Sequence, residues 1–246
     1  MIDKHGFIKF MIDAGALRFG DFTLKSGRIS PYFINTGVFN TGEKISCLGS
    51  YYAECIKDAM NAGGIPQNIS TVFGPAYKGI PLAVATAAAL GRAYGMDAGY
   101  TFNRKEPKDH GEATACMTGN GPSASRVGTE AVLVGSPLND GDRIIIVDDV
   151  ITAGTAMREI VPLIRAAADV EICGLVLSVD RMERGHGEGG LSAVDEVRRA
   201  LGIPVYPIVT VKDIVEFSTS LKIGGRPAID EGARDRMLSY MAEHCV

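Results

Sequence analysis

Short apolar runs alternate along the chain with segments whose apolar residues recur at helical spacing. This spacing predicts a helix over residues 7–17, with Gly15 near its end. Residues 19–39 are rich in β-branched and aromatic residues and are interrupted by glycine and proline, which predicts short strands and turns. Residues 43–62 return to helical spacing. The N-terminal part is therefore predicted to hold two helices separated by short strands.

The rest of the chain repeats a strand, loop and helix order. Residues 70–95 and 143–167 each predict a short buried strand, a Gly-containing loop and a helix, and residues 98–104 and 171–181 predict further strands. Continuous apolar runs such as IIIV and GLVLSV are typical of parallel strands covered on both faces. The predicted fold class is therefore α/β, with an open, doubly wound, mostly parallel sheet flanked by helices. Ligands of such sheets bind at the carboxyl ends of the strands.

Composition narrows the class of protein. The chain has 246 residues, a formal net charge of −4, 46% hydrophobic and 22% charged positions, which is a soluble globular composition. We interpret it as a single domain over 1–246. The mild acidic excess argues against a nucleic-acid partner. The apolar run over 80–90 contains proline and is far shorter than the ~20 residues needed to cross a bilayer, so no membrane partner is expected.

The cysteines and the N-terminal residues indicate the cellular compartment. The start of the chain mixes charged and apolar residues and lacks the apolar core of a signal peptide. The five cysteines are scattered, with no CxxC motif: Cys47, Cys55, Cys116, Cys173 and Cys245. They are interpreted as reduced thiols, which excludes a zinc finger or a disulfide framework and predicts a cytoplasmic protein.

Residues 143–159, RIIIVDDVITAGTAMRE, carry the strongest chemical signal. A buried strand ends in Asp148 and Asp149, and a small-residue loop containing Thr152 and Gly154 leads into a helix. Free backbone N–H groups and the helix dipole favour a phosphate there, while carboxylates can accept hydrogen bonds from sugar hydroxyls. The ligand indicated is a sugar phosphate. The alternative, that the aspartates only cap the next helix, does not account for the attached TAGTA loop.

A second polar cluster lies at FNRKEPKDHGE, residues 102–112. Arg104, Lys105, Lys108 and His110 fall within seven positions, among acidic residues. By itself the segment reads as a solvated loop of mixed charge. Beside an anion site, it can stabilise the negative charge that develops on a leaving group and can close over the site. The next residues, about 113–130, are small, polar and rich in glycine, which predicts a flexible loop.

The run VDDVITAGTA lacks the glycine and lysine spacing of nucleotide loops and resembles the signature for 5-phosphoribosyl 1-pyrophosphate (PRPP) of the type I phosphoribosyltransferases. The resemblance implies that Asp148 and Asp149 bind the ribose hydroxyls. It also implies a loop that holds the 5′-phosphate, formed by Val150, Ile151, Thr152, Ala153, Gly154, Thr155 and Ala156.

Four further motifs, FTLKSGRISPYFINTG, FGPAYKGIPLA, FNRKEPKDHGE and SVDRMERG, resemble the orotate-specific branch of this family over almost the whole chain. The resemblance implies a small hood over the sheet, built from about 1–40 and the C-terminal segment. It places Tyr77 and Lys78 in a pyrophosphate loop, where the family often has a non-proline cis peptide. The residues implied to contact orotate are Lys25 (shared with PRPP), Phe33, Ile34, Thr152 and Arg181; many relatives have phenylalanine where this chain has Ile34.

The same resemblance implies an activity and its partners. PRPP and orotate would give orotidine 5′-monophosphate and pyrophosphate, a step of UMP biosynthesis, with Mg²⁺ held mainly by PRPP and water near the aspartates. The catalytic residues implied are Lys105, Lys108, His110 and Asp149, and Arg104 would bind PRPP with them. In this family the basic loop reaches across a homodimer into the partner's site. Residues 113–130 make the connection from the basic loop back to the next strand longer than in most relatives.

Two other functions share the PRPP motif. A purine-base phosphoribosyltransferase is disfavoured by the KSGR, PYFIN and SVDR elements, which suit an acidic pyrimidine. A PRPP-sensing regulator without catalysis would carry a DNA-binding module or a basic face, and the chain shows neither while keeping the basic loop.

Overall fold

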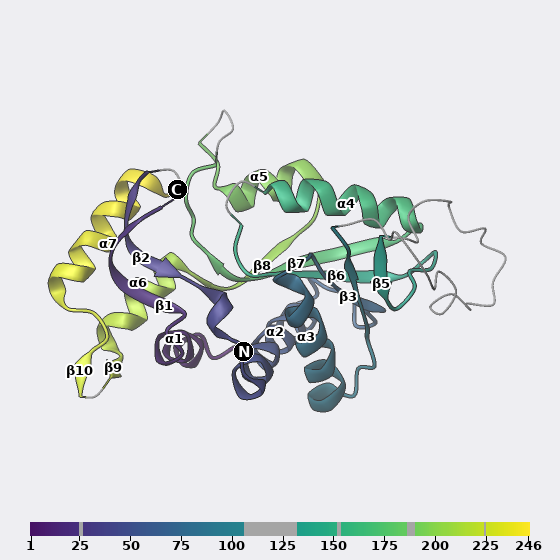
Figure 1. Cartoon of the computed structure of the whole chain (residues 1–246), viewed down its shortest axis with the longest axis horizontal. Helices are drawn as coiled ribbons and strands as arrows, with labels where there is room; N and C mark the ends of the chain where they lie inside the picture. Colours follow the sequence, from purple (N-terminus) through teal and green to yellow (C-terminus); the bar gives the residue numbers. More distant parts are fainter. Residues whose placement is uncertain (25–26, 106–131, 152–153, 186–189, 224) are drawn as a thin grey trace.

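The computed structural model describes residues 1–24, 27–105, 132–151, 154–185, 190–223 and 225–246. Its centre is a six-stranded sheet in the order β5-β4-β3-β6-β7-β8 (Figure 1). The strands are β3 (Thr71–Gly74), β4 (Gly99–Asn103), β5 (Leu133–Gly135), β6 (Arg143–Asp148), β7 (Glu171–Asp180) and β8 (Val205–Thr210). Only β5 is antiparallel to its neighbour, so the predicted mostly parallel α/β sheet is confirmed.

Strand β6 shows why the sheet is covered on both faces. Its side chains alternate, so Ile144 and Ile146 point to one apolar core while Ile145 and Val147 point to the other, and all four are fully buried. Each such burial contributes about 1.5–3 kcal/mol. The helices that cover the two faces are α2 (Gly42–Asn61) and α3 (Gly79–Tyr94) on one side and α4 (Thr155–Ala167) and α5 (Ala193–Leu201) on the other (Figure 1).

The N-terminal and C-terminal segments lie side by side next to β8. They contain α1 (Lys4–Asp13), the antiparallel strands β1 (Leu17–Thr23) and β2 (Ile29–Ile34), the short helix η1 (Thr36–Val38), α6 (Val211–Ser220), β9 (Lys222–Ile223), β10 (Arg226–Pro227) and α7 (Glu231–His244). Helix α7 contacts β2, and α1 contacts both α6 and β8 (Figure 1). Lys4 and Asp213 form an ion pair at 3.0 Å between α1 and α6. Residues far apart in sequence thus form one layer beside the sheet.

The N-terminal helix lies closer to the N-terminus than the sequence predicted, over Lys4–Asp13 instead of 7–17. It ends at Asp13, and Leu17, which the helical spacing included, is buried as the first residue of β1. Gly15 has φ +75°, a left-handed conformation that ends the helix and turns the chain into the strand. The predicted helix over 43–62 is confirmed within one residue at each end. The predicted flexible loop over 113–130 lies outside the described residues.

Candidate active site

Two carboxylates follow the apolar run of β6 at the carboxyl end of the sheet. Asp149 is 6% exposed, and its Oδ2 accepts hydrogen bonds from Thr36 Oγ1 and Lys78 Nζ, both at 2.7 Å. Asp148 Oδ1 accepts one from Asp149 N at 2.8 Å. A buried carboxylate needs partners of this kind. The structure therefore brings Asp149 together with Lys78 of the expected pyrophosphate loop, and adds Thr36, which the sequence analysis did not single out.

The backbone of the acid pair is held from two neighbouring elements. Tyr52 of α2 donates its hydroxyl to the Asp148 carbonyl at 2.7 Å, and Ser178 of β7 donates its backbone N–H to the Asp149 carbonyl at 3.0 Å. Both side chains are buried. Burial and the nearby carboxylate of Asp149 raise the pKa of Tyr52, so its hydroxyl stays a donor. These bonds fix the backbone that carries the two carboxylates.

The carboxyl group of Asp148 is a weaker acid than an ordinary aspartate. Burial, and then the negative charge of Asp149, raise the pKa of Asp148 from 3.8 to about 7. Two adjacent carboxylates in a half-buried place are costly when both are ionised. Ligands that bring hydroxyl donors or a cation relieve that cost, which fits a sugar at this position.

We expect Asp148→Asn to raise the Tm at pH 8 and to leave it unchanged at pH 4. The folded-state pKa lies above the unfolded one, so the folded chain binds more protons between about pH 4 and 7 and stability falls as the pH rises through that window. Asparagine has no charge to penalise, which gives a gain of a few degrees at pH 8. Calorimetry at pH 4, 6 and 8 measures it, with Asp169→Asn at an exposed position as the control. Equal Tm values for the parent and Asp148→Asn at pH 8 would show that the charge of Asp148 does not destabilise the fold.

Gly154 begins helix α4 and closes the predicted phosphate loop. It has φ +69°, and a Cβ added there would lie 2.5 Å from Val197 Cγ2 of α5. Glycine is therefore required both by the backbone conformation and by the space. The first backbone N–H groups of α4 favour an anion. Ile151 is buried with the α4 core, so only its backbone can face a ligand, while Thr152 and Ala153 lie outside the described residues.

With PRPP as the substrate that the family resemblance implies, Gly154→Ala is expected to raise the KM for it about tenfold or more, because the loop must move to relieve the contact with Val197. The matched control is Gly202→Ala, since Gly202 has φ +67° but open space around its Cα. Both variants carry the same left-handed strain, and only the first distorts the loop. Steady-state kinetics and Tm measurements on both separate the two effects; equal KM values for PRPP in the two variants would contradict a role for the loop.

The turn between β3 and α3 carries Tyr77 and Lys78. The peptide bond between Ala76 and Tyr77 is cis, as the family resemblance implied, and Ala76 N donates to Asn103 Oδ1 at 2.8 Å. Tyr77 is 56% exposed. A cavity of about 290 Å³ is lined by Thr36 and Lys78, the two residues that hold Asp149, together with residues of α2 and α3. The turn thus lines open space at the carboxyl edge of the sheet.

The basic loop is described only at its start. Arg104 follows β4, and its N–H donates to the Val132 carbonyl at 2.7 Å. The ammonium of Lys105 lies 5.2 Å from the centre of the Tyr77 ring, a cation–π distance. The structure therefore places the loop entrance against the β3–α3 turn. Lys108, His110 and the other residues over 106–131 lie outside the described residues, as does Lys25.

Phe33 and Ile34 end strand β2. The Phe33 ring stacks on Phe22 of β1 with centroids 5.4 Å apart, and the Arg18 guanidinium lies 5.6 Å from each ring. Ile34 packs against the main apolar core. The next residues of the chain lead directly to Thr36 and hence to Asp149, so β2 ends at the acid pair.

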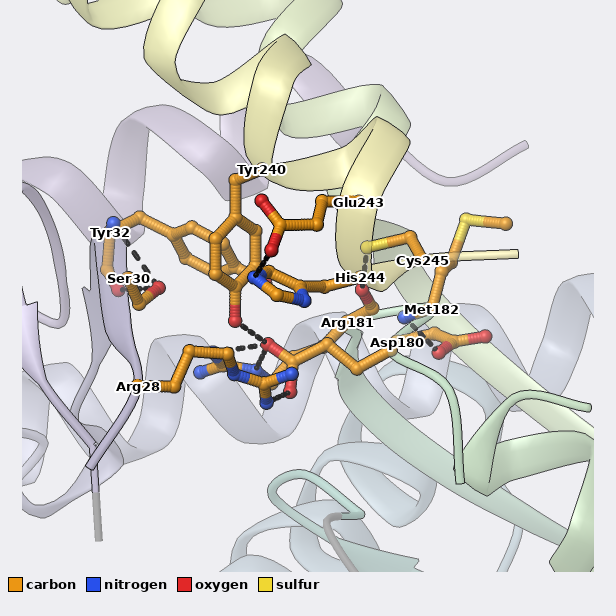
Figure 2. A network of polar contacts seen from close by, with 11 residues as sticks. Arg28, Ser30, Tyr32, Asp180, Arg181, Met182, Tyr240, Glu243, His244 and Cys245 are labelled. Atoms are coloured by element: carbon orange, nitrogen blue, oxygen red, sulfur yellow. Dashed lines mark hydrogen bonds and ion pairs between the residues drawn. The ribbon is translucent and has the colours of Figure 1, made fainter. Parts of the chain in front are cut away.

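Arg181 follows the end of β7, three residues beyond Ser178. Its side chain is only 10% exposed, and its guanidinium donates to Glu183 Oε1 at 2.6 and 2.9 Å. The same group lies 4.7 Å from the centre of the Tyr32 ring (Figure 2). Arg181 is therefore a fixed, nearly buried cation at the carboxyl edge of the sheet.

Sequence reasoning missed the partners of the site residues. Thr36 directly follows the PYFIN motif and Glu183 lies inside SVDRMERG, so both were within quoted motifs without an assigned role. Ser178 is the first residue of the same SVDRMERG motif, also without an assigned role, whereas Tyr52 lies in an ordinary helical pattern that gives no signal. Among the described residues no group of three or more His, Cys, Asp or Glu is arranged to hold a metal ion. No helix in the described part of the chain is long and apolar enough to span a membrane.

Comparisons with known proteins decide the family. Residues 50–197 match the phosphoribosyl transferase domain family. Over 241 residues the chain is 51% identical to orotate phosphoribosyltransferase of Bifidobacterium adolescentis and 48% identical to that of Bifidobacterium longum, covering 98% of this chain and 96% of each relative. The chain belongs to the orotate phosphoribosyltransferase family.

The fold agrees with this membership. The crystal structure of orotate phosphoribosyltransferase from Francisella tularensis superposes with a TM-score of 0.76 at 33% identity, covering 98% of this chain and all of that one. As an orotate phosphoribosyltransferase the chain is a pentosyltransferase of pyrimidine biosynthesis. The purine-base and regulatory alternatives are thereby set aside.

Proposed function

We propose that this chain transfers the 5-phosphoribosyl group from PRPP to orotate at the carboxyl edge of its sheet, releasing orotidine 5′-monophosphate and pyrophosphate. The observation that carries the proposal is the buried Asp149 carboxylate. It accepts hydrogen bonds from Thr36 and Lys78. The loop after it reaches helix α4 at Gly154, where a side chain would clash with Val197. A carboxylate that accepts from hydroxyls, beside a helix N-terminus that favours phosphate, matches the two ends of a ribose 5-phosphate.

The proposed residue roles follow from this placement. Asp148 and Asp149 accept hydrogen bonds from the ribose hydroxyls, and the backbone from Val150 to Ala156 holds the 5′-phosphate. Lys78 is 61% exposed at its side chain and can leave Asp149 for the pyrophosphate when PRPP arrives. Arg181 pairs with the carboxylate of orotate, with Lys25, Phe33, Ile34 and Thr152 completing that subsite.

The proposed chemistry is positioning and charge stabilisation. The difficult step is departure of pyrophosphate from the ribose carbon, and orotate with a deprotonated ring nitrogen is itself the nucleophile. Arg104, Lys105, Lys108 and His110 stabilise the negative charge on the departing pyrophosphate, and His110 can give it a proton. The carboxylate of Asp149 faces the ribose, where positive charge develops. No covalent intermediate with the chain is required.

Mg²⁺ is the proposed cofactor. Mg²⁺ commonly binds through one or two carboxylates, substrate phosphates and water, and the acid pair offers carboxylate oxygens without a complete protein cage among the described residues. The residues therefore fit a metal held mainly by PRPP and water near Asp148 and Asp149. When bound, it neutralises charge on the pyrophosphate group.

We further propose a homodimer in which the basic loop serves the partner's site. Val84 and Tyr94 of α3 and Tyr100 of β4 are each about 40% exposed, which leaves apolar surface on two contacting elements. Strand β4 leads directly into the basic loop, so a contact there would direct the loop toward the partner. We also propose a cytoplasmic location, because the four described cysteines are free thiols and cytosolic proteins keep their thiols reduced.

The activity is tested by the ultraviolet absorbance of orotate mixed with purified protein, PRPP and Mg²⁺. We expect the orotate band to fall only when PRPP and Mg²⁺ are both present. Retained absorbance with PRPP bound by calorimetry would show that the PRPP site is right and the assigned base or the catalysis is wrong. Adenine in place of orotate serves as the control for a purine substrate.

A further inference from the structure

Glu183 receives hydrogen bonds from three separate parts of the chain. Its Oε1 accepts from two nitrogens of Arg181 and from the Tyr240 hydroxyl at 2.7 Å, and its Oε2 accepts from Arg28 at 2.8 Å. Figure 2 shows Arg28, Arg181 and Tyr240 reaching toward one another from the β1–β2 connection, from the end of β7 and from α7. Within the described part of the chain, Glu183 is thus the acceptor that orients the Arg181 guanidinium.

The backbone between the two residues is shaped for this contact. Met182 has φ +53° and is the one residue other than glycine with a positive φ in the described part of the chain. Its N–H donates to Asp180 Oδ1 at 2.7 Å, which closes a local turn. Residues in this region of conformational space persist where the surroundings over-determine them, and they gather at functional sites. The turn brings the side chains of Arg181 and Glu183 together.

Helix α7 and the residues after it hold the same turn. Cys245 Sγ donates to the Arg181 carbonyl at 3.5 Å, and Val246 N donates to the Met182 carbonyl at 3.0 Å. Together with the Tyr240 hydroxyl, these bonds attach the last turn of α7 to the segment that carries Arg181. These contacts restrict the backbone of residues 181–183 and, through Glu183, the side chain of Arg181.

Two positively charged side chains share the single carboxylate of Glu183. Two guanidinium groups, of Arg28 and Arg181, face one carboxylate, and Arg28 Nε is buried without a hydrogen-bond partner among the described residues. Burial alone would raise the pKa of Glu183, but the charge of Arg181 and the hydrogen bonds it receives outweigh burial and the pKa is lowered, so Glu183 stays ionised. A partly exposed cluster in which two guanidinium groups share one carboxylate can accept an anionic ligand.

We propose that Glu183 is the positioning residue for Arg181, and that the Tyr240 hydroxyl makes helix α7 part of the orotate subsite. The proposal rests on the proposed function, in which Arg181 meets the orotate carboxylate. Glu183 accepts hydrogen bonds from Nε and Nη2 of Arg181. The remaining N–H groups of the guanidinium then point toward the ligand. A guanidinium held in this way loses less freedom when orotate binds.

The first test is Tyr240→Phe, which deletes one hydroxyl and keeps the ring between Arg28 and Tyr32. We expect the KM for orotate to rise about five- to tenfold while the KM for PRPP changes less than about twofold. The matched control is Tyr206→Phe, which deletes a hydroxyl donating to the Gly64 carbonyl, also at 2.7 Å, away from Arg181. Equal increases for both substrates, or no increase, would overturn the proposal.

The second test separates this proposal from the proposed function. Arg181→Ala, Glu183→Gln and the double variant are compared by orotate KM, with circular dichroism as the folding check. We expect Glu183→Gln to raise the orotate KM in the parent and to add nothing in the Arg181→Ala background, since it acts through that arginine. If Arg181→Ala raises the KM and both Glu183→Gln and Tyr240→Phe do not, the positioning role is wrong and the proposed function stands. If Arg181→Ala itself leaves the orotate KM unchanged, the assigned orotate contact is wrong, and the positioning role falls with it.

Discussion

Replacing Asp149 with asparagine is expected to lower kcat/KM for PRPP by about two to three orders of magnitude. The Asp149 side chain is 9% exposed and lies where the ribose hydroxyls are proposed to bind. A hydrogen bond to a charged group contributes about 1.5–3 kcal/mol, and an amide keeps only part of that for two hydroxyls. The negative charge that faces the developing positive charge on the ribose is lost as well.

The fold should survive the Asp149→Asn change. The amide oxygen of the new side chain can still accept from Thr36, and the backbone carbonyl at this position remains bonded to Ser178. Asp169→Asn, at an exposed position before β7, is the matched control and should keep full activity. Initial-rate kinetics with PRPP varied, together with Tm, measure the effect. A loss below tenfold in a folded variant would remove Asp149 from the proposed site.

Lys108→Ala is expected to lower kcat about 100-fold or more while changing the KM for PRPP only a few-fold. The family resemblance places this lysine on the loop that stabilises the departing pyrophosphate, where charge develops only in the transition state. An interaction made mainly in that state appears in kcat. Lys9→Ala, at an exposed position in α1, is the control. Equal losses in kcat and in PRPP affinity would show that Lys108 acts in ground-state binding.

The same variant tests the proposed sharing of loops. If the loop serves the partner's site, a mixture of Lys108→Ala and Asp149→Asn chains forms heterodimers with one intact site. Random exchange then restores about a quarter of the parent activity, because half of the dimers are mixed and each has one working site of two. Activity that stays at the level of the separate variants after subunit exchange would place the loop in its own subunit's site.

Much of the fold follows from local pattern. The run IIIV in β6 is short, β-branched and without a polar position, which is typical of a strand buried on both faces, and the parallel sheet and its flanking helices were predicted correctly. The end of the first helix was placed too late because Leu17 fits helical spacing as well as it fits a strand. Apolar periodicity alone does not distinguish the two, and the left-handed conformation of Gly15 decides it.

By itself, the sequence determined those parts of the site that lie within one short stretch. Asp148, Asp149 and Gly154 are neighbours on a strand, loop and helix, so spacing and residue type already indicate their chemistry. The contacts of Asp149 with Thr36 and Lys78 span 113 and 71 residues, and those of Glu183 with Arg28 and Tyr240 span 155 and 57. Only the tertiary structure decided these partnerships, because no local propensity specifies which distant side chain meets a buried carboxylate. That choice depends on how the strand order and helix packing bring separate elements to one edge of the sheet.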